Sequence, residues 1–243
     1  MCKRCNDNNA NGVCQEWPRG NKLKENMNKT LNTLKRVLEK SKGTIYVYVL
    51  TTVKANGHGG FIQMGSAPNF QGGLITLCTC KHWMRTWRTP DAWKNVWIAG
   101  FTGVNILGDH KNYLFYLMQV QKAFYSHKEL WDWLDPTVKK AKNASKHKCG
   151  DVYEPTPNLT DPFDPSHYCE PIKEPKHVHF KNNDWFKDIN YTNTKTKRHP
   201  AVLVGAPEYS FLWSRPKIYF KDKLPRTKKW NDIKEFLHLL VSR

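Results

Sequence analysis

The sequence predicts an α+β fold with a curved, mostly antiparallel mixed sheet, open or barrel-like, flanked by helices and preceded by an N-terminal helical extension. Runs of β-branched and aromatic residues short enough for strands occur in groups along the chain. Helical patterns are inserted between these groups, whereas a doubly wound parallel sheet, the alternative, requires strict alternation. Ten tryptophans and an aromatic share of 13% supply large rings for a core.

The first 43 residues are expected to form a cysteine-containing tail and a basic amphipathic helix. Between Asn21 and Lys42 apolar residues recur at three- and four-residue steps, which is the period of a helix, and Gly43 is expected to end it. Residues 44–243 are expected to form a single α+β domain, because a chain of 243 residues lies within the range of one large domain.

The remaining elements follow from short apolar runs and from Gly, Pro and Asn between them. The expected strands are Thr44–Val53, Leu74–Cys80, Asn95–Phe101, Tyr113–Val120, Ala201–Val204, Glu208–Trp213 and Lys217–Phe220. The expected helices are His82–Trp93, broken at Pro90, then Ser126–Leu134, with Ser126 as N-cap and Pro136 as its stop, and Asn231–Val241. Long loops are expected at Ala55–Gly73 and Cys149–His199.

The charge of the chain predicts a polyanionic partner. Thirty-nine Lys and Arg against 21 Asp and Glu give a formal net charge of +18, which attracts DNA, other nucleic acids or nucleotides. No basic helix carries the Trp or Phe face that membrane surfaces favour, so no membrane partner is expected. Neither a long apolar run nor a signal peptide is visible, and a soluble cytoplasmic protein is therefore expected.

Seven cysteines, an odd number, do not indicate a disulfide framework. Cys2, Cys5 and Cys14 have the first spacing of a zinc knuckle without a second Cys pair, so a zinc site and a tail of reduced thiols are both hypotheses. No other cofactor is indicated. A second tract with metal-binding side chains contains His167, Cys169, His177 and His179.

One segment carries an unusual combination of residues: Ala67-Pro68-Asn69, then Gly72-Gly73, then a Thr-Leu strand ending in Cys80-Lys81, with Arg85 after it. Together with glycines at 100 and 103, the strand Tyr113–Val120 and the turn Gly150–Tyr153, this order of elements resembles the nucleotide modification associated domain 2 family from Thr44 to the C-terminus. The resemblance implies a role in phage or bacterial systems that modify nucleic-acid bases or handle modified ones. The resemblance does not imply a particular reaction.

Lys81 and Arg85 lie four residues apart after a strand, so on a helix they share a face and can clamp a phosphate; a surface pair is the other interpretation. Asn69, in a turn made rigid by Pro68, can bind a base edge through its amide or serve only the turn. Bare backbone at the glycines lets a ligand approach. The expected nucleotide- or phosphate-binding residues are Asn69, Gly72, Gly73, Thr76, Lys81 and Arg85.

Three residues are candidates for catalysis. Asp151 is the candidate general base or orienting carboxylate, with Tyr153 at a spacing that puts both side chains on one side. Cys80 beside Lys81 is a candidate nucleophile, against the alternative of an inert buried thiol. Trp83 and Trp87, interleaved with cations, are candidates for stacking on nucleic-acid bases, against the alternative of core packing.

The leading hypothesis is an enzyme that binds DNA and acts on a nucleotide or an already modified base, in a pocket between residues 67–73 and 150–153. The first alternative is a non-catalytic reader that flips a modified base into an aromatic cage. The second is an antiphage effector nuclease, which the lack of clustered acidic metal ligands disfavours.

Overall fold

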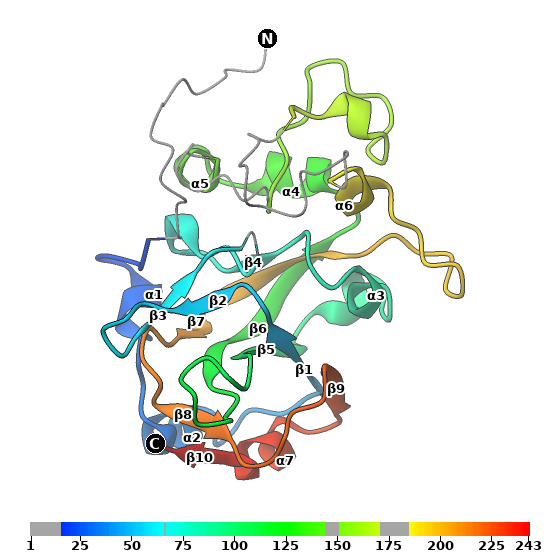
Figure 1. The fold of residues 1–243 in the computed structure, drawn as a ribbon. Coiled ribbons are helices and arrows are strands. Elements are labelled where there is room, and N and C mark those ends of the chain that lie inside the picture. Colours follow the sequence, from blue (N-terminus) through cyan, green and yellow to red (C-terminus); the bar gives the residue numbers. More distant parts are fainter. Residues whose placement is uncertain (1–15, 66, 144–150, 171–184) are drawn as a thin grey trace. The chain divides into compact units, whose positions relative to one another are not determined.

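A computed structural model describes residues 16–65, 67–143, 151–170 and 185–243 (Figure 1). The chain divides into two compact units. Unit one comprises the residues up to Pro18, Gly65–Lys94 and Lys122–Val204, and unit two comprises Arg19–Met64, Asn95–Gln121 and Gly205–Arg243. The candidate site residues that the structure describes all belong to unit one, whereas Cys2, Cys5, Cys14, Gly150, His177 and His179 lie outside the described residues.

The main strands of unit two combine one parallel pairing with antiparallel ones. β1 (Ile45–Leu50) pairs in parallel with β5 (Trp97–Thr102) and antiparallel with β9 (Thr227–Trp230). β5 also pairs antiparallel with β6 (Leu114–Phe124). In unit one, β4 (Thr76–Leu77) pairs antiparallel with the start of β7 (Val202–Leu212). The predicted α+β fold with a mixed, mostly antiparallel sheet is confirmed.

Two short antiparallel pairs complete the strands. β2 (Val53–Ala55) pairs with β3 (Phe61–Gln63), and β8 (Ile218–Phe220) pairs with β10 (Leu240–Ser242). The β2–β3 hairpin falls in a stretch that we expected to be a loop. Its turn is closed by Asn56, whose Oδ1 accepts from the amides of His58 and Gly60, both at 2.9 Å.

The helices are short. They are α1 (Lys22–Glu25), α2 (Leu31–Val37), α3 (His82–Arg85), α4 (His127–Trp133), α5 (Pro136–Lys142), α6 (Phe186–Asn190) and α7 (Ile233–His238), with 3-10 turns η1 (Gln71–Gly73), η2 (Asp91–Trp93) and η4 (Pro165–His167). Over the ranges given above, no helix has the length and apolar character needed to cross a membrane.

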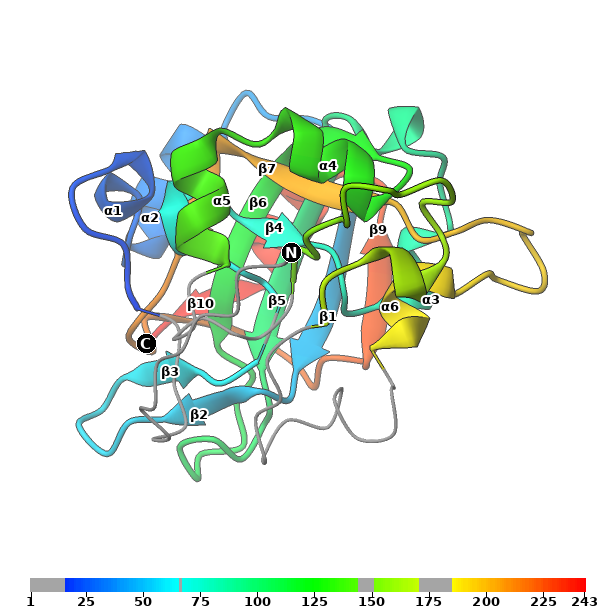
Figure 2. The same ribbon diagram turned by 90° about the horizontal axis from the view of Figure 1, so that it is seen from above.

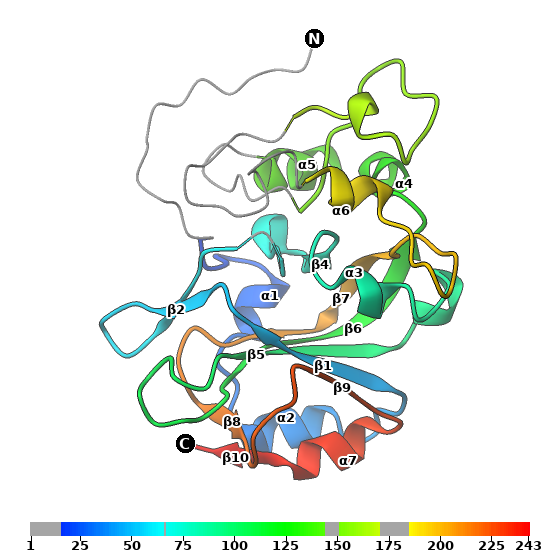
Figure 3. The ribbon, with the colours of Figure 1, turned by 45° about the vertical axis from the view of Figure 1, so that its right-hand side comes forward.

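The core of unit two lies between its sheet and the helices α2 and α7, which lie side by side on one face (Figure 3). Alternate residues along each strand point into this core, including Ile45 and Val47 on β1 and Trp97 and Ala99 on β5. Gly100 of β5 leaves room for the ring of its cross-strand partner Tyr116 on β6, because a Cβ at position 100 would lie 2.4 Å from that ring. The Tyr116 hydroxyl in turn shares a buried hydrogen bond of 2.8 Å with that of Tyr48.

Unit one has two smaller apolar clusters. In Figure 2, α4 and α5 cover β4. The first cluster fills the space among these elements and contains Leu74, Cys78, Phe124, Leu130, Leu134, Val152, Val202 and Val204. The second contains Tyr153, Tyr168, Trp185 and Ile189. Each cluster includes a residue with a polar partner: the Cys78 amide of the first bonds to Asp151, and the Tyr153 hydroxyl of the second bonds to Asp188.

The prediction of a single helix between Asn21 and Lys42 is wrong, because this segment forms two separate helices, α1 and α2. Asn28 between them has φ of 54°, a left-handed conformation that interrupts a helix. The Asn28 side chain is used elsewhere: its Oδ1 accepts from the amide of Ser214 at 3.0 Å and that of Arg215 at 3.2 Å. Thr30 then caps α2 by accepting from the Thr33 amide at 3.2 Å, and the helix ends at Val37, before Gly43.

Other expected boundaries also differ. Ser126 caps α4 as predicted, accepting from the Glu129 amide at 3.2 Å. Pro136 follows that helix and also occupies the first turn of α5. An N–H at this position has no partner within the helix, so the lack of one in proline does not destabilise α5. The two strands expected between Ala201 and Trp213 form the single strand β7, β9 was not expected, and the C-terminal helix stops at His238 before β10.

Candidate functional site

Asp151 is the centre of a buried polar cluster in unit one. Its side chain is 1% exposed. Oδ2 accepts from the Thr76 hydroxyl, and Oδ1 accepts from the Cys78 amide at 2.9 Å and from the Thr79 hydroxyl at 3.5 Å. Burial raises the pKa of Asp151, and the hydrogen bond from Thr76 and the charge of Lys142 oppose that rise. Both oxygens of the carboxylate therefore accept hydrogen bonds from β4 and from the residues that follow it.

Lys142, the last residue of α5, is the cation of this cluster. Its ammonium donates to the Leu74 carbonyl at 2.7 Å, to the Asn69 carbonyl and Oδ1 at 3.1 and 3.2 Å, and to the Thr76 hydroxyl at 3.1 Å. Burial lowers the pKa of Lys142 to about 8, against the opposing charge of Asp151. Lys142 and Asp151 therefore meet through Thr76, and between them they fix the segment from Asn69 to Thr79.

Gly72 does not leave room for a ligand on the side that faces α5. Gly72 has φ of 71°, and a Cβ there would lie 3.1 Å from the Val138 side chain and 3.2 Å from its Cα. The glycine thus lets α5 approach η1 closely, which brings Lys142 to its acceptors. Asn69 also faces inward, because its Oδ1 accepts from the Gln71 amide at 3.0 Å as well as from Lys142.

Arg85 lies inside unit one, with no exposed surface. Its Nε donates to the Cys80 carbonyl at 2.8 Å and its Nη1 donates to the Ala201 carbonyl at 2.6 Å, while Nη2 is buried without a hydrogen bond. In the described part of the chain no carboxylate forms an ion pair with it. Lys81, half-buried, begins α3 with φ of 59°. The two side chains expected to clamp one phosphate therefore differ in environment, and Arg85 connects backbone segments.

A chain of polar groups links α3, α6 and the segment around Tyr153. Asp188 of α6 is buried, and its Oδ1 lies 2.8 Å from Nε2 of His82, close enough for an ion pair when the imidazole is protonated. The Tyr153 hydroxyl donates to the other oxygen of Asp188 at 2.8 Å. Burial, followed by the charge of Asp188, raises the pKa of Tyr153 well above its usual value, so the phenol stays a donor. His82 is 22% exposed and thus connects this chain to the surface.

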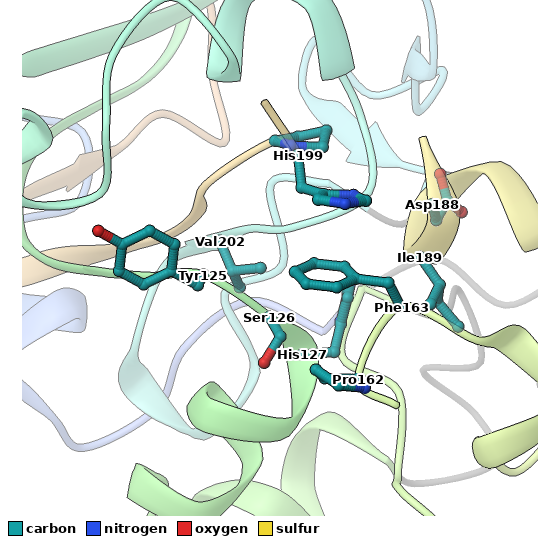
Figure 4. A pocket seen from close by; sticks show the side chains of 10 residues that line it. Tyr125, Ser126, His127, Pro162, Phe163, Asp188, Ile189, His199 and Val202 are labelled. Atoms are coloured by element: carbon teal, nitrogen blue, oxygen red, sulfur yellow. The ribbon is translucent and has the colours of Figure 1, made fainter. Parts of the chain in front are cut away.

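His127 lies beside this chain and is fully neutral at physiological pH. Burial lowers its pKa to about 3, and the positive charge of Arg85 lowers it further, against the charge of Asp188. Its Nδ1 accepts from the Tyr153 amide at 3.4 Å, and its ring packs against the Tyr153 ring with centroids 4.9 Å apart. His127 also lines a small pocket with Asp188 and His199 (Figure 4).

Two pairs of aromatic rings involve residues of α3 and the turn after it. The His82 ring stacks on Tyr191 with centroids 5.3 Å apart. Trp83 is 55% exposed and meets the half-buried Trp87 edge-on at 5.7 Å. We call the set His82, Trp83, Trp87 and Tyr191, with the cations Lys81, Arg88 and Lys187, the α3–α6 surface. The set combines aromatic rings, of which Trp83 is exposed, with three cations on or next to α3 and α6, the helices that carry His82 and Asp188.

Three of the seven cysteines lie in the described part of the chain. Cys78 and Cys80 are free thiols, Cys78 buried and Cys80 half-buried, and burial raises the pKa of Cys78 well above its usual value. Cys169 is disulfide-bonded, which the odd number of cysteines did not lead us to expect. Over the described ranges no group of three or more His, Cys, Asp or Glu side chains is arranged to hold a metal ion. The candidate zinc ligands Cys2, Cys5 and Cys14 lie outside those ranges.

The structure thus separates the residues that the sequence grouped together. Thr76, Asn69 and Asp151 meet in the buried cluster, Tyr153 joins the chain to His82, and Trp83 and Trp87 lie at the α3–α6 surface. Sequence reasoning missed the residues Lys142, His82, His127, Asp188 and His199. Only His127 had a local signal, since it follows the N-cap Ser126.

Comparisons of the chain with protein-family models, with curated proteins and with solved structures found no match.

Proposed function

We propose that this chain is a nucleic-acid-binding protein of a phage or bacterial base-modification or defence system, which acts in the cytoplasm on a nucleotide or a modified base. The proposal is supported by the net charge of +18 and by the resemblance of the Ala67–Arg85 segment to the nucleotide modification associated domain 2 family. The observation that carries it is the α3–α6 surface, where an exposed tryptophan adjoins a histidine paired with a buried carboxylate.

The surface has the two components that single-stranded nucleic acid requires. The exposed face of Trp83 offers a plane on which a base can stack, and every base has such a face. Lys81, Arg88 and Lys187 supply positive charge for the backbone phosphates. Because neither component reads base edges by hydrogen bonds, binding at this surface tolerates different sequences.

The His82–Asp188 pair supplies acid–base chemistry next to the stacked base. His82 exchanges a proton with the bound nucleotide, and Asp188 stabilises the imidazolium that results, at 2.8 Å. Tyr153 holds Asp188 through its hydroxyl, which fixes the carboxylate in place. A reader of modified bases would use the same surface without turnover, so release of a chemically altered nucleotide separates the two functions.

The first prediction is a strong salt dependence of nucleic-acid binding. Each phosphate neutralised on a single strand contributes about 0.7 to the slope of log affinity against log salt, so the three cations of the α3–α6 surface predict a slope of about 2 or more. The measurement is the fluorescence anisotropy of a labelled single-stranded DNA of mixed sequence between 50 and 200 mM salt. A slope near zero would contradict the proposal.

A further inference from the structure

The loop between α6 and β7 concentrates positive charge on unit one. Residues 192–198, which we call the basic loop, contain Lys195, Lys197 and Arg198 and no Asp or Glu. All three cationic residues are exposed, and within the described part of the chain no carboxylate forms an ion pair with any of them. In Figure 1 the segment between α6 and β7 projects beside α3. The basic loop therefore offers its charge to a partner outside the chain.

The buried side chain of Asn193, 2% exposed, folds the basic loop into a fixed turn. Its Oδ1 accepts from the amides of Lys195 at 2.9 Å and Thr196 at 3.1 Å. The Asn193 amide donates to the Arg198 carbonyl at 3.0 Å, and the Asn193 carbonyl accepts from the Lys197 amide at 2.8 Å. Because the backbone that carries the cations is already ordered, binding an anion there loses little backbone entropy.

The first half of the basic loop is attached to α3. Tyr191, which immediately precedes the loop, stacks its ring on that of His82 with centroids 5.3 Å apart. Asn193 Nδ2 donates to the Thr86 hydroxyl at 2.7 Å, and Thr86 is the C-cap of α3. The loop is thus joined to both ends of this short helix.

The chain that leaves the basic loop returns to the same helix. The Ala201 amide donates to the Arg85 carbonyl at 3.3 Å, and Arg85 Nη1 donates to the Ala201 carbonyl at 2.6 Å. The attachment points on α3 lie within about one helical turn of Trp83, the exposed ring of the α3–α6 surface. The basic loop is therefore held beside the residue on which we propose that a base stacks.

We infer that the basic loop binds backbone phosphates of a strand whose base stacks on Trp83, so that the ligand is a nucleic-acid strand and not a free mononucleotide. The inference rests on the proposed function and names its substrate class. The basic loop and the α3–α6 surface contribute three cations each. A mononucleotide has one phosphate with about two negative charges, whereas a strand has a phosphate at every nucleotide and can engage cations at both places.

The test removes the charge of the basic loop and keeps its backbone. In a variant with Lys195→Gln, Lys197→Gln and Arg198→Gln, the hydrogen bonds of Asn193 remain, because they use backbone groups of these residues. For a strand of about ten thymidines, we expect the slope of log affinity against log salt to fall by about 2, from about 0.7 per phosphate. The affinity at about 50 mM salt should fall about tenfold or more. Thymidine 5′-monophosphate should bind wild type and variant within about twofold, as measured by isothermal titration calorimetry.

The matched control removes three exposed cations from unit two, with Lys221→Gln, Lys223→Gln and Lys229→Gln. Its net charge equals that of the basic-loop variant, and its affinity for the strand is expected to stay within about threefold of the wild type. The inference is overturned, and the proposed function stands, if the control loses as much affinity as the basic-loop variant or if that variant binds the strand like the wild type. Equal losses for strand and mononucleotide also overturn it, because the loop would then bind the nucleotide's own phosphate. A wild-type protein that binds neither ligand overturns the proposed function as well.

Discussion

The Asp151→Ala variant is expected to lose about 3 to 5 kcal/mol of its free energy of unfolding. The substitution removes the acceptor of the Thr76 hydroxyl and the Cys78 amide, and it leaves the buried ammonium of Lys142 without an opposing charge. Breaking one side of a buried charge pair costs this much because the remaining charge stays out of water. Urea denaturation followed by circular dichroism measures the loss.

The matched control for Asp151 is Asp132→Ala. Asp132 is an exposed carboxylate of unit one that pairs with Lys128 on the same helix face, so its removal is expected to cost less than about 1 kcal/mol. If Asp151→Ala instead unfolds at the same urea concentration as the wild type and loses activity on a nucleotide, Asp151 acts on the ligand and the buried cluster is not its main role.

The second large effect is expected at Arg85. Arg85→Ala should destabilise the protein by about 3 kcal/mol or more, because it leaves a cavity and removes the donors of the Cys80 and Ala201 carbonyls. Arg85→Lys should recover little of this, since an ammonium cannot reproduce two separated guanidinium donors. Thermal and urea unfolding of both variants give the measurement.

Arg88→Ala is the control, because Arg88 lies three residues further along the chain and is half-buried near the surface. Its loss is expected to cost less than about 1 kcal/mol and to lower the slope of the salt dependence instead. The interpretation of Arg85 would be wrong if Arg85→Ala melted like the wild type while its DNA affinity fell. The guanidinium would then reach the phosphate, as its spacing from Lys81 led us to expect.

Local sequence patterns correctly predicted those helices and strands whose determining residues lie within the element itself. Ser126 and Glu129 define the start of α4, and alternation along β1 and β5 places Ile45 and Trp97 in the core. Asn28 could not be predicted to break a helix, because its side chain bonds to Ser214 and Arg215, which are distant in sequence. Structure that depends on residues close together in the sequence could therefore be predicted, whereas structure that depends on residues far apart in the sequence could not.

The same limit explains the candidate site. Lys142 lies among lysines that resemble a solvated face, and only the carbonyls of Asn69 and Leu74 make it a buried cation. The pair His82–Asp188 joins a short helix to a segment in a region without periodicity, so no spacing in the sequence indicates it. Trp83, by contrast, lies among cations in the sequence, a context typical of stacking surfaces, and the structure shows that its ring is exposed.

The measurement that tests the central proposal most directly is the DNA affinity of Trp83→Ala against that of Trp133→Ala. Both tryptophans belong to unit one and are exposed, Trp83 by 55% and Trp133 by 42%, but Trp133 lies outside the α3–α6 surface and packs against Phe124 at 5.4 Å. Loss of one stacked base predicts at least a fivefold weaker affinity for Trp83→Ala, from about 1 to 3 kcal/mol per base, and a change within about twofold for Trp133→Ala. Equal affinities of Trp83→Ala and the wild type, in folded protein, would contradict the proposal that nucleic acid binds at this surface.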